Sequence, residues 1–377
     1  MGGGCGVTAS GRWAERIARA QAALREEGLG GMVLGPSDQM RYLTGWAEHG
    51  HERFIGLFVP EKGEPVFLVP EMNAPQARRS PAGLSAVVGW RDAEGWQSAA
   101  GEILSRWRVE GRTLAVDGEL HAVHLLDLQA VTPASRWVAA GALMARLREI
   151  KSAEELELLR RSASVTDAVY EACLPHLREG ITERQVQDVI SRLYAERGTR
   201  PAFALVCFGA NSALPHHSTG DARLRRGDVV ILDIGCLLEG YASDITRTLA
   251  VAEPEPEADR VYDVVWRAHC AALQTARPGV TCEAVDEAAR AVIREAGYGG
   301  QFIHRTGHGI GLSTHEPPYI VQGNRQELRP GMCFSDEPGV YLEGRFGVRI
   351  ENIVAVTETG AEPMNAWPPD RLIRIPA

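Results

Sequence analysis

The chain has 377 residues, of which 45% are hydrophobic and 24% charged, an ordinary composition for a folded protein of about two domains. No stretch approaches about 18 consecutive apolar residues, which argues against a membrane span, and the opening MGGGCGVTAS lacks the features of a secretory signal. A formal net charge of −9 argues against a nucleic-acid partner, and seven scattered cysteines without a CxxC pair favour reduced thiols and a cytoplasmic location.

Residues 1–147 are predicted to form an α/β domain. A first helix is expected to begin at Ser10, as its N-cap, and to end at Gly28. Apolar runs between turn signals predict strands at 31–34, 54–59, 65–69, 84–88 and 113–116, with helical stretches at 94–107 and 121–130. This alternation favours an open α/β sheet. No glycine-rich phosphate loop follows any of these strands, so we interpret the domain as a support or assembly domain.

A second domain is predicted from residue 148 to residue 377. The segment Ser152-Ala-Glu-Glu155 fits a capping box, in which the serine and glutamate side chains satisfy each other's backbone donors. A charged helix is therefore expected to begin at Ser152, and the domain boundary is placed just before it.

The second domain contains an internal repeat at a constant offset. Gly180-Ile-Thr182 and Gly279-Val-Thr281 each open an amphipathic helix that ends at a glycine, and His216 and His315 keep the same spacing. Further on, an acidic strand end recurs at Asp233 and Glu337. We interpret this pattern as a duplication, whose two facing halves place Asp233 opposite Glu337 and His216 opposite His315.

Four segments carry acidic or imidazole side chains that are candidates for catalysis or metal binding. Asp233 and Asp244 flank a Glu239-Gly240 turn, so two antiparallel strands bring them onto one face, although two such aspartates alone more often lie on a solvated surface. Glycines on both sides of His308 let the backbone turn tightly and leave the ring accessible, or make a turn with an incidental histidine. Glu337 follows a third strand.

Glu351 lies within an apolar, strand-like run, where an unpaired carboxylate is costly to bury. An ion pair with Arg349 and a metal-binding role explain it equally well when the segment is considered alone.

Considered together, the five side chains indicate a metal site. Four carboxylates a few ångströms apart cannot all stay ionised without compensation, and two divalent cations supply it. Oxygen ligands with one imidazole favour Mn²⁺, with Co²⁺ or Zn²⁺ as alternatives, and such a pair of ions suits hydrolysis of an acyl bond. The set comprises Asp233, Asp244, His308, Glu337 and Glu351.

The motifs that hold these residues resemble those of a metallopeptidase family. They are Asp233-Ile-Gly235, Ser243-Asp-Ile-Thr-Arg247, His304-Arg-Thr-Gly-His-Gly-Ile-Gly311, His315-Glu-Pro-Pro318, Glu337-Pro-Gly-Val-Tyr341 and Gly347-Val-Arg-Ile-Glu351. The family contains prolidase, aminopeptidase P, methionine aminopeptidase and creatinase. The resemblance implies a duplicated α+β "pita-bread" catalytic domain over roughly 150–360, preceded by an α/β creatinase-type N-terminal domain, and a homodimer.

The resemblance also implies roles for individual residues. All five clustered side chains are metal ligands, with Asp244 and Glu351 bridging two ions and Glu337 also moving the proton of the attacking water. His216 and His315 are catalytic residues that flank the substrate and hydrogen-bond its carbonyl. Arg349 is counted with them as a substrate-binding residue and also supports a ligand carboxylate. Asp336, beside Glu337, departs from the family's pattern, but on a strand it points away, so little effect is expected beyond added negative charge that shifts metal affinity slightly.

The preceding domain favours an Xaa-Pro peptidase over a methionine aminopeptidase, and the intact ligand set argues against a metal-free creatinase. The substrate is therefore expected to be a proline-containing dipeptide or short peptide. The segment from Tyr42 to Arg53 is a candidate for a loop that caps the pocket, or an ordinary surface connection. A metal-dependent hydrolase or lyase of a small non-peptide, or a binding protein without catalysis, are the alternatives.

Overall fold

The computed structural model describes residues 9–376 and divides the chain into two compact units, one up to Arg148 and one from Glu149. Residues 1–8, which include Cys5, lie outside the described residues. They form most of the opening segment in which no secretory signal is expected. Within residues 9–376, no helix is both long and apolar enough to cross a bilayer. The six cysteines of this part of the chain are all free thiols.

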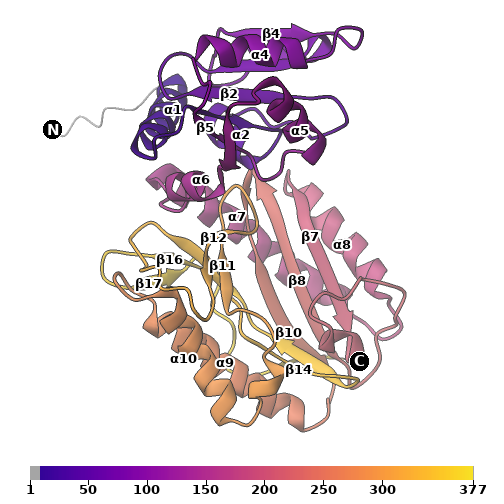
Figure 1. The fold of residues 1–377 in the computed structure, drawn as a ribbon. Coiled ribbons are helices and arrows are strands. Elements are labelled where there is room, and N and C mark those ends of the chain that lie inside the picture. Colours follow the sequence, from indigo (N-terminus) through magenta and orange to yellow (C-terminus); the bar gives the residue numbers. More distant parts are fainter. Residues whose placement is uncertain (1–8, 377) are drawn as a thin grey trace, which may run out of the picture. The chain divides into compact units, whose positions relative to one another are not determined.

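The first unit is built on one mixed sheet of six strands in the order β4-β3-β2-β1-β5-β6 (Figure 1). The strands are β1 (Gly31–Leu34), β2 (Gly56–Pro60), β3 (Val66–Pro70), β4 (Val87–Trp90), β5 (Thr113–Val116) and β6 (Arg136–Ala139). The helices are α1 (Ala9–Glu26), α2 (Asp38–Thr44), η1 (Glu71–Asn73), α3 (Ala74–Arg78), α4 (Gln97–Arg106), α5 (Ala122–Val131) and α6 (Gly141–Arg148). The expected open α/β sheet is confirmed.

Two expectations for this unit are corrected. The first helix begins at Ala9, so Ser10 lies inside its first turn and not at its N-cap. Tyr42 belongs to helix α2 and is buried, so the proposed capping loop does not begin there. Ser37 caps this helix by accepting hydrogen bonds from the amides of Gln39 and Met40, and Gly45 ends it with a positive φ of 70°. The rest of that loop stays a prediction.

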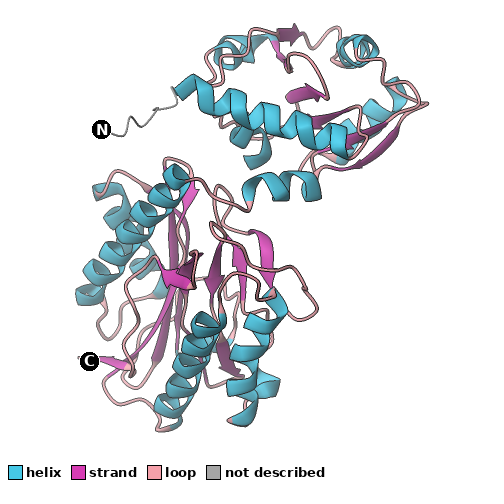
Figure 2. Cartoon of the chain, turned by 90° about the vertical axis from the view of Figure 1, so that its left-hand side faces the viewer, coloured by secondary structure: helices cyan, strands magenta, loops and turns pink. Residues whose placement is uncertain are grey.

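The second unit contains two five-stranded sheets flanked by long helices (Figure 2). Its first half comprises α7 (Ala153–Cys173), η2 (Leu174–His176), α8 (Glu183–Glu196), β7 (Arg200–Phe208), η3 (Gly209–Ala213), β8 (Val229–Leu238), β9 (Tyr241–Ala242) and β10 (Ile245–Val251). The second half comprises α9 (Glu257–Thr275), α10 (Cys282–Glu295), η4 (Gly299–Gln301), β11 (Gly307–Gly309), β12 (Glu316–Ile320), β13 (Cys333–Asp336), β14 (Gly339–Leu342), β15 (Phe346–Arg349), β16 (Asn352–Val356), β17 (Ala361–Pro363) and β18 (Ile373–Ile375). The predicted capping box at Ser152 and Glu155 opens α7.

The two halves repeat the same local structure. Thr182 caps α8 and Thr281 caps α10, and each threonine forms an isolated antiparallel bridge to the segment before the next central strand. The amide of Gly180 bonds to the carbonyl of Leu224 at 2.8 Å, and the amide of Gly279 bonds to that of Leu328 at 2.9 Å. Both glycines have a positive φ, 85° and 82°, which favours glycine. The structure thus contains the duplication that the sequence pattern predicts.

Each half has its own apolar core, and hydrogen bonds from backbone amides of the second half join it to the first. One core packs α7 and α8 against β7, β8 and β10, and the other packs α9 and α10 against the second sheet. The amide of Glu351 bonds to the carbonyl of Thr246 at 3.1 Å, and the amide of Arg349 bonds to the hydroxyl of Thr248 at 3.1 Å. Residues from both halves therefore meet along this line.

Candidate metal centre

Asp233 and Asp244 come from the antiparallel pair β8 and β10. Asp233 lies opposite Thr246 in the register of the two strands, and Asp244 comes directly before β10. The turn at Glu239 and Gly240 is found where the sequence predicts it, and both residues have a positive φ. Both aspartates line the same cavity, which has a volume of about 370 Å³. The hairpin therefore places the two carboxylates together.

His308 lies in β11, between Gly307 and Gly309. A Cβ atom at Gly307 would lie 1.6 Å from the carbonyl oxygen of Ser335, and one at Gly309 would lie 2.4 Å from that of Pro317. The two glycines thus permit close approach of the backbone to two neighbouring segments. The expected tight turn is wrong, because His308 lies in a strand. The expected accessible ring is also wrong, because His308 is only 2% exposed. Its Nδ1 lies 3.1 Å from the carbonyl of Gly309, which can only accept, so Nε2 of the neutral ring carries no proton and can act as a ligand.

Glu337 and Glu351 are contributed by the second half. Glu337 comes directly after β13, and its Oε1 lies 3.2 Å from Nε2 of His308. Glu351 comes directly before β16, and its Oε2 accepts a hydrogen bond from the hydroxyl of Thr246 at 2.7 Å. Arg349 pairs with Asp233 at 2.6 Å. The described residues show no direct ion pair between Arg349 and the Glu351 side chain, so such a pair is not what compensates the burial of Glu351.

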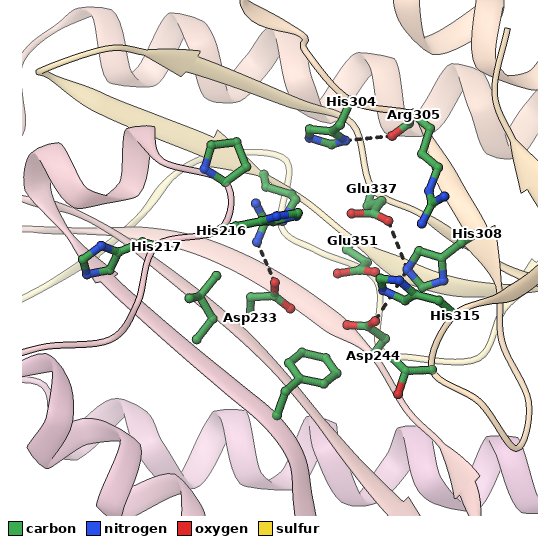
Figure 3. Close-up of a pocket in the computed structure, with 15 residues that line it drawn as sticks. His216, His217, Asp233, Asp244, His304, Arg305, His308, His315, Glu337 and Glu351 are labelled. Atoms are coloured by element: carbon green, nitrogen blue, oxygen red, sulfur yellow. Dashed lines mark hydrogen bonds and ion pairs between the residues drawn. The ribbon is translucent and has the colours of Figure 1, made fainter. Parts of the chain in front are cut away.

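All five predicted ligands meet in the cavity (Figure 3). Donor atoms lie within 4.8 Å of one another in three groups: Asp233, Asp244 and Glu351; His308, Glu337 and Glu351; and Asp244, His308 and His315. The first two groups share Glu351 and contain only predicted ligands. The carboxylate oxygens Asp233 Oδ1, Asp244 Oδ1 and Glu351 Oε1 are buried without a hydrogen-bond partner. Buried carboxylate oxygens normally have partners, so these orphaned atoms fit divalent cations, and two donor groups sharing Glu351 fit two of them.

The crowding of carboxylates perturbs their ionisation. Burial and the charge of Glu351 raise the pKa of Asp244 well above its ordinary value, and burial with the charges of Glu337 and Asp233 does the same to Glu351. Burial would also raise the pKa of Glu337, but the hydrogen bond and charge of His308 outweigh it and lower this pKa to about 2. Ionising all four carboxylates together would therefore create an excess of negative charge, which bound cations would neutralise.

A chain of hydrogen bonds supports the acidic residues. Arg349 donates from Nε to the hydroxyl of Thr246 at 3.1 Å and from Nη1 to the hydroxyl of Tyr341 at 2.8 Å. The Tyr341 hydroxyl in turn lies 2.8 Å from Nε2 of His304, whose Nδ1 lies 2.7 Å from the carbonyl of Arg305. The Arg349 side chain therefore has three partners, which are Thr246, Tyr341 and Asp233.

The two predicted substrate histidines line the same cavity, and both are exposed. His216 lies in the turn after η3, and the ring of His315 lies 3.8 Å from that of His308 between centroids. Burial of part of the ring, with the charges of His308 and Arg305, lowers the pKa of His315 to about 4. A neutral imidazole results at neutral pH, which can donate one hydrogen bond to a carbonyl oxygen.

The residue beside His216 has a different function. His217 Nε2 lies 2.9 Å from Oε2 of Glu183, a fully buried carboxylate in the first turn of α8. Glu183 also accepts hydrogen bonds from the amides of Phe208 and Gly220. This carboxylate therefore fastens both ends of the loop that carries His216.

Sequence reasoning assigned no role to Glu183, Arg305 or Tyr341. Arg305 and Tyr341 lie inside the motifs given above, close in sequence to predicted ligands, and this proximity could have marked them as site residues. Glu183 opens an amphipathic helix like many exposed acids, and nothing in the sequence separates it from them. Asp336 points away from the cavity as expected, but it is a buried partner of His269, 3.0 Å away, and not a charge added to the site.

Two family models match the chain. Residues 157–358 match metallopeptidase family M24, and residues 16–150 match the creatinase/prolidase N-terminal domain. The chain belongs to metallopeptidase family M24. It is thus an enzyme of the metallopeptidase class that uses divalent metal ions, and its fold is the creatinase-type α/β domain followed by the pita-bread domain.

Relatives of this M24 protein cover nearly its whole length. The probable dipeptidase PepE of Mycobacterium tuberculosis is 39% identical over 366 residues, which is 96% of each chain. The crystal structure of dipeptidase PepE from Mycobacterium ulcerans has a TM-score of 0.92 at 38% identity and covers 99% of this chain and 100% of that one. The recombinant prolidase from Thermococcus sibiricus has a TM-score of 0.92 at 33% identity, with 96% and 99% covered.

Proposed function

We propose that this protein is an Xaa-Pro dipeptidase that holds two divalent metal ions, preferably Mn²⁺. The observation that carries the proposal is the pair of donor groups that share Glu351 and include three buried oxygens without hydrogen-bond partners. The similarity to a dipeptidase and a prolidase supports the substrate class. A homodimer and a cytoplasmic location stay predictions.

The proposed ligands are Asp233, Asp244, His308, Glu337 and Glu351. When bound, divalent ions act as Lewis acids on the scissile carbonyl and acidify the attacking water. Glu337 would take the proton from that water and deliver it to the leaving amine, and its position at the cavity wall beside His308 supports this role.

The remaining polar residues bind and orient the substrate. His216 and His315 face the cavity and would donate hydrogen bonds to the carbonyl oxygen as negative charge develops on it. Arg349 holds Asp233 in place through the 2.6 Å ion pair, and we assign it this positioning role in preference to direct contact with substrate.

Proline suits this site because an Xaa-Pro bond is a tertiary amide without an N–H group. A peptidase that must bind that N–H cannot use such a substrate, whereas the residues here address the carbonyl. The cavity wall also offers the apolar side chains Phe203, Leu205 and Pro215, against which a proline ring can pack.

The test compares Ala-Pro, Ala-Pro-Ala and Ala-Ala as substrates of the metal-free protein supplied with Mn²⁺, Co²⁺ or Zn²⁺. Metal analysis of the freshly purified protein accompanies it. We expect cleavage of Ala-Pro above the other two and about two ions per chain. Cleavage of none of these peptides would favour a non-peptide substrate, and one ion per chain in an active preparation would refute the two-metal assignment.

A further inference from the structure

Lys151 and Glu316 form a buried ion pair to which the mechanism gives no task. The ammonium group lies 2.8 Å from Oε1 of Glu316 and 3.4 Å from the carbonyl oxygen of Glu149. The two paired side chains are only 1% and 6% exposed. Burying two opposite charges costs about as much free energy as their attraction returns, so stability alone does not account for such a pair.

The lysine of this pair is unusual for the chain. Of 40 basic residues, only Lys62 and Lys151 are lysine, and Lys62 is exposed. Lys151 is therefore the one position at which the chain buries an ammonium group. An ammonium is a compact point charge, whereas the larger, planar guanidinium directs five donors outward in a rigid fork. We interpret Lys151 as a compact cation fitted to one carboxylate oxygen.

Glu316 connects this cation to the loop of residues 311–315. It is the first residue of β12 and directly follows His315. Its carboxylate lies against the backbone at the other end of the loop, where a Cβ atom on Gly311 would be 2.5 Å from Oε1. The carbonyl oxygen of Gly311 accepts a hydrogen bond from the amide of Ala242 at 2.8 Å. The Glu316 carboxylate thus spans both ends of the loop, and Lys151 fixes the carboxylate.

The internal repeat contains a second pair of this kind. His315 lines the metal cavity, whereas Glu316 faces Lys151, as expected for successive residues at the start of a strand. The repeat aligns Glu316 with His217, since each directly follows a substrate histidine at the constant offset. His217 pairs with the buried Glu183 at 2.9 Å. In both halves, the residue after a substrate histidine is therefore held by a buried polar partner.

We propose that Lys151 and Glu316 are positioning residues, which fix the loop 311–315 and thereby direct His315 at the substrate carbonyl. This inference rests on the proposed function and deepens it. Neither residue touches the substrate, since both act through His315. A displacement of about 1 Å in a group of this kind can lower the rate about a hundredfold.

The experiment compares Lys151→Met with the double variant Lys151→Met/Glu316→Gln. The single variant leaves Glu316 buried without Lys151 and should lose stability in urea, whereas the double variant removes both charges and should regain most of it. Both lack the ion pair, so we expect kcat/KM for Ala-Pro to fall about ten- to a hundredfold in both, with Mn²⁺ affinity unchanged. Lys62→Met, which removes the exposed lysine, is the control. An original rate in the double variant would overturn the proposal.

A double-mutant cycle with His315→Asn shows whether the pair acts through His315. In that background, Lys151→Met/Glu316→Gln should change kcat/KM by less than about twofold, because the group that the pair positions is already absent. An equal loss in both backgrounds would overturn the proposal, since it indicates a general structural role.

The crystal structure of the double variant provides a test that needs no substrate. We expect the loop 311–315 to shift and the His315 ring to leave its place 3.8 Å from that of His308. An unmoved ring would overturn the proposal. Failure of the unmodified protein to cleave Ala-Pro would refute the proposed function alone, because the position of His315 in the double variant still decides the role of Lys151 and Glu316.

Discussion

Arg349 and Asp233 form an ion pair across the two halves of the duplicated domain, with 2.6 Å between Nη2 and Oδ2. The pair leaves Oδ1 of Asp233 buried and without a hydrogen-bond partner. One oxygen is thus fixed by the protein and the other is presented to the cavity. Asp233 is oriented before any ligand arrives.

Replacement of Arg349 by Gln should therefore weaken metal binding and activity together. Residues that orient a ligand carboxylate commonly contribute about ten- to a hundredfold, and we expect a loss of that size in Mn²⁺ affinity and in kcat/KM. Titration of the metal-free variant with Mn²⁺ measures the first quantity. Arg374→Gln, which removes an exposed arginine paired with Asp259, is the control. Unchanged Mn²⁺ affinity in Arg349→Gln would contradict the positioning role.

Glu337→Gln should abolish turnover while the cavity keeps its shape. The amide cannot take a proton from water, and loss of a positioned base costs about a hundred- to ten-thousandfold in kcat. Glu343→Gln changes an exposed glutamate of the following turn and should leave the rate unchanged. Rates for Glu337→Gln equal to those of the unmodified protein, at saturating Mn²⁺, would remove Glu337 from the mechanism.

The sequence predicted which residues form the site better than it predicted the contacts that hold them in place. The acidic strand ends and the repeat are local patterns, so Asp233, Glu337 and the duplication could be found without a structure. His308 was found for an incorrect reason, because the glycines beside it serve backbone packing that depends on strands distant in sequence. The resemblance implied that Arg349 supports a ligand carboxylate but not which one, since its partner Asp233 lies 116 residues away.

Removal of metal should destabilise the protein, and Glu351→Gln should reverse part of that effect. Without cations, four carboxylates repel one another in a buried site, whereas a neutral amide at Glu351 relieves the repulsion. At a metal concentration about 100 times Kd, binding contributes about 2.7 kcal/mol to unfolding free energy. Thermal unfolding with EDTA or Mn²⁺ measures this, and we expect the metal-free variant to melt above the metal-free parent. A melting temperature of metal-free Glu351→Gln below that of the metal-free parent would argue against repulsion among the four carboxylates.

Glu183→Gln should impair substrate binding and leave metal affinity unchanged. The carboxylate fastens the loop of His216 through His217 and two backbone amides, whereas an amide group presents only one acceptor oxygen. We expect kcat/KM for Ala-Pro to fall about tenfold, the effect of about 1.4 kcal/mol. Glu196→Gln, at the other end of the same helix and exposed, is the control. A parallel loss of Mn²⁺ affinity would show that the change spreads beyond the loop.

Gly307→Ala should unfold the metal centre, because a Cβ atom there would lie 1.6 Å from the carbonyl oxygen of Ser335. That atom is backbone, so β11 and β13 must separate, and His308 moves away from Glu337. Overpacking that displaces backbone costs about 1–3 kcal/mol or more, and we expect a loss of stability at the upper end with no Mn²⁺ binding. Gly300→Ala adds the same methyl group where nothing lies within 4 Å and should leave stability and metal binding unchanged. Urea unfolding and Mn²⁺ titration of both variants measure the difference. Normal Mn²⁺ affinity in Gly307→Ala would mean that the close approach of these strands is not what fixes His308.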